Sequence, residues 1–148
     1  MTGRREYPER PMVGVGGVVI VGGRALLIRR GSPPLEGQWS IPGGMLEIGE
    51  ALSDGVRREL FEETAIEVKV LDLIEVFERI TRDESEHVKY HFVIADYLCE
   101  MVRGEAQAAS DVTDVAWVRE GDLEKYSLTV TATRVIRKAF EMARARNL

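Results

Sequence analysis

Three glutamates cluster in the stretch from Gly44 to Ile66 of this chain. Glu59, Glu62 and Glu63 are three and four residues apart, so a helical conformation would place their side chains on one face. Carboxylates packed that closely repel one another unless a positive charge lies among them. Because hard divalent cations such as Mg²⁺ prefer oxygen ligands, the spacing predicts a helix face that binds metal.

The same stretch resembles the Nudix box, in which a glycine, a glutamate and an Arg-Glu-apolar-x-Glu-Glu segment stand at fixed distances. The positions that match the box are Gly44, Glu50, Arg58, Glu59, Leu60, Glu62, Glu63 and Ile66. One position departs from it, because the family usually has glycine where this chain has Ala65. A left-handed residue closing the helix would suit glycine there, and alanine adopts that conformation at a cost of about 1 kcal/mol.

The resemblance implies a metal site on the three glutamates. Glu59, Glu62 and Glu63 would bind Mg²⁺ or Mn²⁺, with a carbonyl group of Gly43 or Gly44 completing the ligand shell. A bound metal polarises a diphosphate and lowers the pKa of an attacking water. The implied reaction is hydrolysis of a nucleoside diphosphate linked to another moiety. The alternative, a solvated acidic face with scattered arginine pairs, does not explain the fixed distances to the glycines.

Arg58 is interpreted as the partner that orients the carboxylates, chiefly Glu50, through its planar guanidinium group. Glu50 is itself a candidate metal ligand, acting through water. The resemblance gives catalytic roles to Arg58, Glu62 and Glu63.

In this family a further carboxylate often comes from a loop outside the box, as metal ligand or general base. The candidates are Glu105, Asp111 and Asp114. We favour Asp111 as a catalytic residue, because it lies in a polar loop shortly before Trp117, where several relatives carry such an acid. The alternative is that Asp111 only caps a turn.

Two arginines are candidates for binding the substrate phosphates. Arg29 and Arg30 end a predicted strand, and alternation along a strand turns only one of them toward a given face. The alternative is an exposed charge on an edge strand. Three aromatic residues on later strands, Phe77, Tyr90 and Phe92, could stack on a base, although strand aromatics more often belong to the core.

The periodicity of the chain predicts an α+β fold. Residues 12–20 and 25–30 are expected to form a hairpin, residues 50–64 a helix containing Gly55, and residues 129–146 a closing amphipathic helix. Further strands are expected in residues 67–80, 88–100 and 115–118. A mixed β-sheet between helices is the simplest arrangement, and it is the α/β/α sandwich that the Nudix resemblance implies. Gly55 costs about 1 kcal/mol against alanine, which suggests a close approach of another backbone segment.

The bulk properties limit the class of protein. A length of 148 residues predicts one domain, over residues 11–148, after a flexible lead-in at residues 1–10. The net charge of −5 argues against binding of a nucleic-acid backbone. No apolar run is long enough for a membrane helix, so no membrane partner is expected. The single cysteine, Cys99, is typical of a reducing, cytoplasmic location. Because relatives often form homodimers, the resemblance leaves a homodimer open.

The flanking segments resemble Nudix proteins grouped with ADP-ribose pyrophosphatases. The first hypothesis is therefore hydrolysis of ADP-ribose or another nucleotide sugar to a nucleoside monophosphate and a sugar phosphate. The alternative is a house-cleaning nucleoside triphosphate pyrophosphohydrolase that releases pyrophosphate. A second alternative is a non-catalytic module that senses nucleotides, although the complete set of carboxylates argues against it.

Overall fold

The computed structural model describes residues 5–148, which form a seven-stranded sheet with helices. The strands are β1 (Met12–Val21), β2 (Arg24–Arg30), β3 (Trp39–Ser40), β4 (Gly43–Met45), β5 (Glu67–Arg82), β6 (Val88–Arg103) and β7 (Val112–Arg119). The helices are α1 (Leu52–Thr64), the 3₁₀ helix η1 (Glu120–Tyr126) and α2 (Val130–Ala145). The predicted α+β fold is confirmed.

β1 and β2 form the predicted hairpin, closed by a two-residue turn. Val21 pairs with Arg24, which leaves Gly22 and Gly23 between the strands. Their φ angles of 56° and 75° lie in the left-handed region, which glycine adopts without strain. The two glycines therefore fix the register with which β2 returns along β1.

β1 is the central strand, and it changes partners along its length. Residues 14–16 pair antiparallel with β4, while residues 12–19 pair parallel with β6. The end of β1 pairs with β2, which also carries β3 and β7, and β5 lies beside β6 at the far edge. The predicted mixed sheet is thus present, and the part of β1 beside β4 lines the cavity described below.

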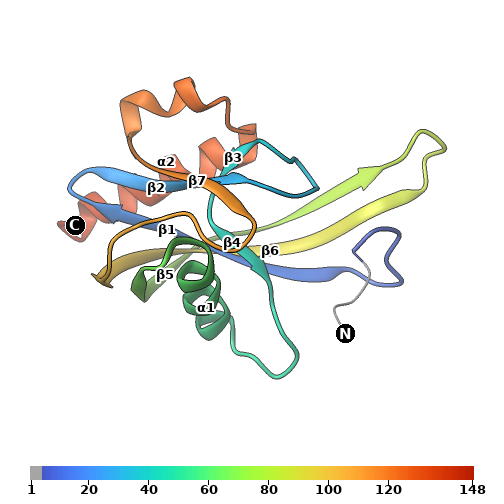
Figure 1. The fold of residues 1–148 in the computed structure, drawn as a ribbon, viewed down its shortest axis with the longest axis horizontal. Helices are drawn as coiled ribbons and strands as arrows, with labels where there is room; N and C mark the ends of the chain where they lie inside the picture. The colour runs from blue at the N-terminus through green and yellow to red at the C-terminus, as the bar shows by residue number, and fades with distance from the viewer. Residues whose placement is uncertain (1–4) are drawn as a thin grey trace.

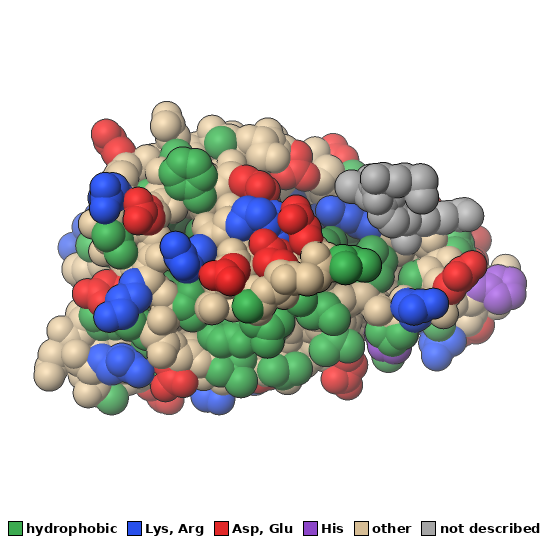
Figure 2. Space-filling model, turned by 90° about the horizontal axis from the view of Figure 1, so that it is seen from below, with side chains coloured by type: hydrophobic (Ala, Val, Ile, Leu, Met, Phe, Trp, Pro, Cys, Tyr) green, Lys and Arg blue, Asp and Glu red, His purple; other side chains and the backbone are tan. Residues whose placement is uncertain are grey.

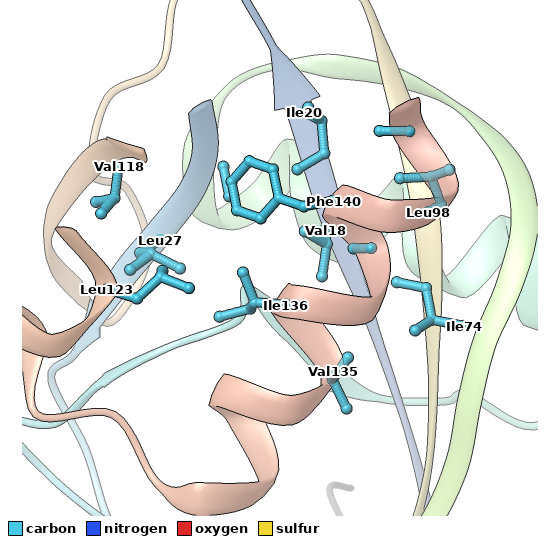
Figure 3. Close-up of a cluster of buried hydrophobic side chains, with 13 residues drawn as sticks. Val18, Ile20, Leu27, Ile74, Leu98, Val118, Leu123, Val135, Ile136 and Phe140 are labelled. Carbon is cyan, nitrogen blue, oxygen red and sulfur yellow. The ribbon is translucent and has the colours of Figure 1, made fainter. Parts of the chain in front are cut away.

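The two helices pack on opposite sides of the sheet (Figure 1). α2 covers a core cluster that includes Val18, Leu27 and Leu98 (Figure 3). α1 covers a second cluster that includes Val19 and Cys99. Because Val18 and Val19 are neighbours on one strand, their membership of different clusters follows from the alternation of side chains across a sheet.

α1 begins slightly later than the sequence predicts. Ala51 is extended, with φ −70° and ψ 151°, so Glu50 precedes the helix and can turn back toward it. At the other end Ala65 is left-handed, with φ 62° and ψ 16°, and its N–H donates to the carbonyl of Phe61. The left-handed closure expected there is therefore present, on alanine in place of glycine.

The remaining boundaries differ little from the prediction. β7 begins at Val112 because Val112 still pairs with Arg30 of β2. Residues 1–4 lie outside the described residues, so the flexible lead-in over residues 1–10 stays a prediction. Within its described part, the Tyr7 hydroxyl donates to the Asp83 carboxylate over 2.9 Å. In the described chain, no helix is both long enough and apolar enough to cross a membrane.

Candidate active site

Arg58 is the centre of the charged cluster on α1. Its guanidinium group holds Glu50 with two hydrogen bonds, of 2.7 Å from Nε and 2.9 Å from Nη2. Nη1 donates to Glu59 over 2.8 Å and to Glu62 over 3.3 Å, and Nη2 also donates to the Met45 carbonyl over 3.0 Å. The predicted pairing of Arg58 with Glu50 is confirmed. Acidic side chains surround basic ones near the middle of the face that carries α1 (Figure 2).

The pairing fixes the charge of both partners. Hydrogen bonds from Arg58 lower the pKa of Glu50, and the contact with Glu50 raises the pKa of Arg58 far above its usual value. A bidentate pair of this kind restricts the rotation of both side chains. The pairing with Glu50 therefore fixes the position of the Arg58 guanidinium group, which in turn contacts Glu59 and Glu62.

Glu63 lies deeper than the other carboxylates. It is 8% exposed and accepts a hydrogen bond of 2.8 Å from the N–H of Gly43. Burial raises its pKa to about 8, and burial also raises the pKa of Glu59. Arg58 offsets part of this effect on Glu59, whereas Glu63 forms no ion pair within residues 5–148.

The donor set fits a hard divalent cation. Among residues 5–148, no three His, Cys, Asp or Glu side chains are grouped closely enough to enclose an ion, because Glu59 and Glu62 turn toward Arg58. The available ligands are nevertheless all oxygens, and a Cβ on Gly44 would overlap the Glu59 carboxylate. Glycine thus lets that carboxylate approach the backbone of β4. A cation here would supply the positive charge that the buried Glu63 carboxylate lacks.

Asp111 faces the helix from the loop before β7. It lines the same cavity as Glu59, Glu62 and Glu63, and its Oδ2 accepts a hydrogen bond of 2.5 Å from Ser32. Of the three loop carboxylates considered from the sequence, the structure brings only this one to the cavity. Glu105 and Asp114 are exposed and do not line it.

Arg30, and not Arg29, belongs to the site. Arg30 is partly buried in the cavity wall, its Nε donates to the Pro34 carbonyl over 2.6 Å, and burial lowers its pKa. Arg29 points the other way, and its Nε donates to the Gly37 carbonyl over 3.2 Å. The sequence predicted that only one of the pair could face the site, and the structure identifies which.

The cavity has a volume of about 280 Å³ and two distinct ends. One end carries the α1 carboxylates, Asp111 and Arg30. The other is lined by side chains of β5 and β6, namely Phe77, Arg79, Phe92, Ile94 and Asp96.

Asp96 was missed by the sequence reasoning. It lies on the strand face shared by Phe92, Ile94 and Leu98, and a carboxylate at an apolar position of such a strand was the signal that could have identified it. The structure also brings Phe77 and Phe92 to the cavity, whereas Tyr90 does not line it.

Comparison with known sequences gives consistent matches. The NUDIX domain model matches residues 10–139. A MutT-like protein of Streptomyces ambofaciens is 34% identical over 130 residues, which cover 87% of this chain and 77% of the relative. An ADP-ribose pyrophosphatase of Methanocaldococcus jannaschii is 31% identical over 115 residues, covering 78% of this chain and 66% of that protein. The nucleoside triphosphatase NudI of Escherichia coli K12 is 26% identical over 106 residues, covering 68% and 75%.

Solved structures agree with these matches. The crystal structure of a MutT NUDIX hydrolase from Burkholderia pseudomallei aligns with a TM-score of 0.76 at 30% identity. The alignment covers 88% of this chain and 98% of that one.

Proposed function

This chain belongs to the NUDIX family and is a hydrolase of phosphorus–oxygen anhydride bonds, and from that premise we propose that it hydrolyses ADP-ribose or a related nucleotide sugar. The products would be a nucleoside monophosphate and a sugar phosphate. The observation that carries the proposal is the cavity, in which the α1 carboxylates face Asp111 and Arg30. This end offers ligands for a metal, a candidate base and a cation for phosphate within one space.

Glu59, Glu62 and Glu63, with a carbonyl of Gly43 or Gly44 and with Glu50 acting through water, are the residues that would hold Mg²⁺ or Mn²⁺. When bound, the metal supplies Lewis acidity and an acidified water. The chain itself supplies the positioning, because Arg58 holds the carboxylates in place through its contacts with Glu50 and Glu59.

Asp111 and Arg30 act from the opposite wall. We assign Asp111 the role of general base, since Ser32 holds its carboxylate in the cavity. Burial lowers the pKa of Arg30, and Glu63 and Asp111 lie close enough to offset part of that lowering, so its guanidinium group is a candidate partner for substrate phosphates at this end. An Asp111→Asn variant should lose turnover and keep most of its affinity for Mn²⁺. Unchanged turnover would refute the base role.

Hydrolysis of nucleoside triphosphates is the second candidate function. It is favoured by the similarity to NudI, whereas the similarity to an ADP-ribose pyrophosphatase is higher in identity and in the share of this chain covered. The two reactions differ in what lies beyond the β-phosphate, which is a sugar in one and a terminal phosphate in the other.

A product-resolved hydrolysis assay with Mg²⁺ or Mn²⁺ distinguishes them. ADP-ribose should give AMP and ribose 5-phosphate with a higher kcat/KM than any nucleoside triphosphate. A monophosphate plus pyrophosphate as the favoured products would overturn the nucleotide-sugar proposal and support the alternative. Omission of the metal should abolish turnover.

Three further expectations accompany this proposal. We propose that residues 11–148 act as one domain, which is supported by the extent of the family match. A cytoplasmic location is supported by the single, buried cysteine Cys99. A homodimer stays open as a proposal, to be tested by sedimentation.

A further inference from the structure

The end of the cavity that β5 and β6 line contains the buried carboxylate of Asp96, and the neighbouring groups do not neutralise it. Asp96 of β6 is 3% exposed and lines the cavity. Within the described residues, no hydrogen bond to its carboxylate is formed. In the same residues, every side-chain nitrogen or oxygen atom that is fully shielded from solvent does have a hydrogen-bond partner, so the Asp96 oxygens are not fully shielded. The oxygens of Asp96 therefore keep access to the cavity.

The backbone opposite Asp96 is adapted to this side chain. Asp96 pairs with Gly16 of β1, and a Cβ on Gly16 would overlap the carboxylate. Glycine at this position thus leaves the space that the acid occupies.

The charges around Asp96 do not compensate for its burial. Arg79 on β5 attracts the carboxylate without a hydrogen bond, and Glu75 on the same strand repels it. Glu75 is itself held by Arg134 of α2. Burial raises the pKa of Asp96 to about 7, so it costs free energy to keep this residue ionised near neutral pH. A purely structural role would not explain why an unpaired acid is placed here.

The walls beside Asp96 are apolar and partly aromatic. Phe77 pairs with Ile94 and Arg79 pairs with Phe92 across β5 and β6, which puts these side chains next to one another at the cavity. Phe92 also stacks on Tyr90, with ring centroids 5.8 Å apart. Largely apolar walls with one carboxyl group, and with Arg79 near it, fit a flat ring that offers hydrogen-bond donors at its edge.

We propose that Asp96 is a specificity-determining residue that recognises the amino-bearing edge of the substrate's nucleobase. This inference rests on the proposed function in taking a nucleotide as the substrate. As a carboxylate, Asp96 would accept hydrogen bonds from N1–H and the 2-amino group of guanine. As a carboxylic acid, it would accept from the 6-amino group of adenine and donate to N1. Unsubstituted purine has neither an exocyclic amino group nor an N1–H, so it forms no hydrogen bond with the carboxylate and only one with the acid, and would be bound less well in either case.

The test is equilibrium binding of AMP, GMP and purine riboside 5′-monophosphate in the presence of Mg²⁺, measured by titration calorimetry. These ligands share their ribose and phosphate, so their affinities differ only through the base. The wild-type protein should bind AMP, GMP or both at least about 10-fold more tightly than purine riboside 5′-monophosphate. The measurement needs no turnover, so a failure of the hydrolysis proposal would not decide it.

Two variants distinguish recognition of the base by the carboxylate of Asp96 from recognition by its carboxylic acid. Asp96→Ala should reduce the preference over purine riboside 5′-monophosphate to less than about 2-fold. Asp96→Asn keeps the size of the side chain and presents one donor and one acceptor, so it should preserve a preference for AMP and reduce a preference for GMP that depends on two acceptor oxygens. The control is Asp72→Asn, an exposed acid on β5, which should leave all affinities unchanged.

Several results would overturn the proposal. They are equal affinity of the wild-type protein for all three nucleotides, no measurable binding of any of them at millimolar concentration, and a preference over purine riboside 5′-monophosphate that persists in Asp96→Ala. A preference retained in Asp96→Ala would place base recognition on other residues.

Discussion

The two helices of this protein follow different rules. α2 has a hydrogen-bonded N-cap, in which Thr129 accepts from the N–H of Ala132, and it buries an apolar stripe that includes Ile136 and Phe140. α1 has no side-chain cap at Ala51 and has a left-handed alanine at its C-terminal end. α2 satisfies the local rules of helix stability, whereas α1 breaks several of them.

The irregularities of α1 have causes at the site. Gly55 was expected to mark a close backbone, but the neighbours that a Cβ would meet are side chains, Leu46 Cδ1 at 2.8 Å and Glu50 Oε1 at 3.1 Å. The absence of a side chain at Gly55 therefore gives space to Glu50, which Arg58 then holds. The helix that carries the chemistry is built around its carboxylates at the expense of its own stability.

The largest expected effect comes from the buried carboxylate of α1. Glu63→Gln removes a charge from the predicted metal site and should reduce kcat for ADP-ribose by about 100-fold or more, with little change in thermal stability. Steady-state kinetics and thermal denaturation measure the two effects.

The matched control lies on the same helix. Asp54 is exposed and, among residues 5–148, pairs only with Arg57, at 3.5 Å, so Asp54→Asn should leave kcat unchanged. Full turnover by Glu63→Gln would show that α1, like α2, does not carry a carboxylate that catalysis needs.

α2 should show the opposite behaviour. Ile136 is fully buried, and Ile136→Ala should lower the free energy of unfolding by about 3 kcal/mol through lost contacts and a residual cavity. Under conditions where the variant is folded, kcat/KM should equal that of the wild-type protein. A loss of kcat/KM beyond about 10-fold in the folded variant would mean that α2 contributes to the site.

Asp96 is the exception on the α2 side of the sheet, because it is a buried acid among apolar residues. Its pKa is about 7 in the folded protein against an ordinary value of 3.8. Below the lower value, Asp96 is protonated in both the folded and the unfolded protein. Its contribution to the stability of the folded protein is fully present there and is lost as the pH rises through the folded pKa. Glu75 and Arg79 remain in Asp96→Asn, so a comparison with this variant isolates the effect.

Asp96→Asn should therefore be as stable as the wild-type protein near pH 4 and more stable by on the order of 2 kcal/mol near pH 8. Chemical denaturation at the two pH values measures the difference. A gap that does not change with pH would show that Asp96 titrates normally.

The smallest effect concerns the end of α1. Ala65 is left-handed, and glycine adopts that conformation without the steric cost of a Cβ. Ala65→Gly should raise the free energy of unfolding by about 1 kcal/mol and leave kcat unchanged. A decrease in stability would mean that contacts of the alanine methyl group outweigh its backbone strain.

The sequence predicted well what depends on local spacing. The helical face of Glu59, Glu62 and Glu63, and the pairing of Arg58 with Glu50, follow from residues within a single segment. The hairpin of β1 and β2 likewise follows from its glycine turn.

What the sequence could not provide is placement through space. The choice of Arg30 over Arg29 depends on how β2 and β7 pair, and the sequence favours Asp111 over Glu105 and Asp114 only through the family resemblance. The position of Asp96 depends on the pairing of β6 with β1. No local pattern specifies these pairings, because they join segments that are distant in the chain.

The parallel pairing of β1 with β6 also has a consequence for folding. It joins residues 12–19 to residues 92–99, and closing so long a loop costs entropy before any contact repays it. α2, in contrast, satisfies the local rules of helix stability and can form early. During refolding we therefore expect the helical signal to appear before the ability to bind nucleotide, so that the cavity is completed only when these distant strands have met.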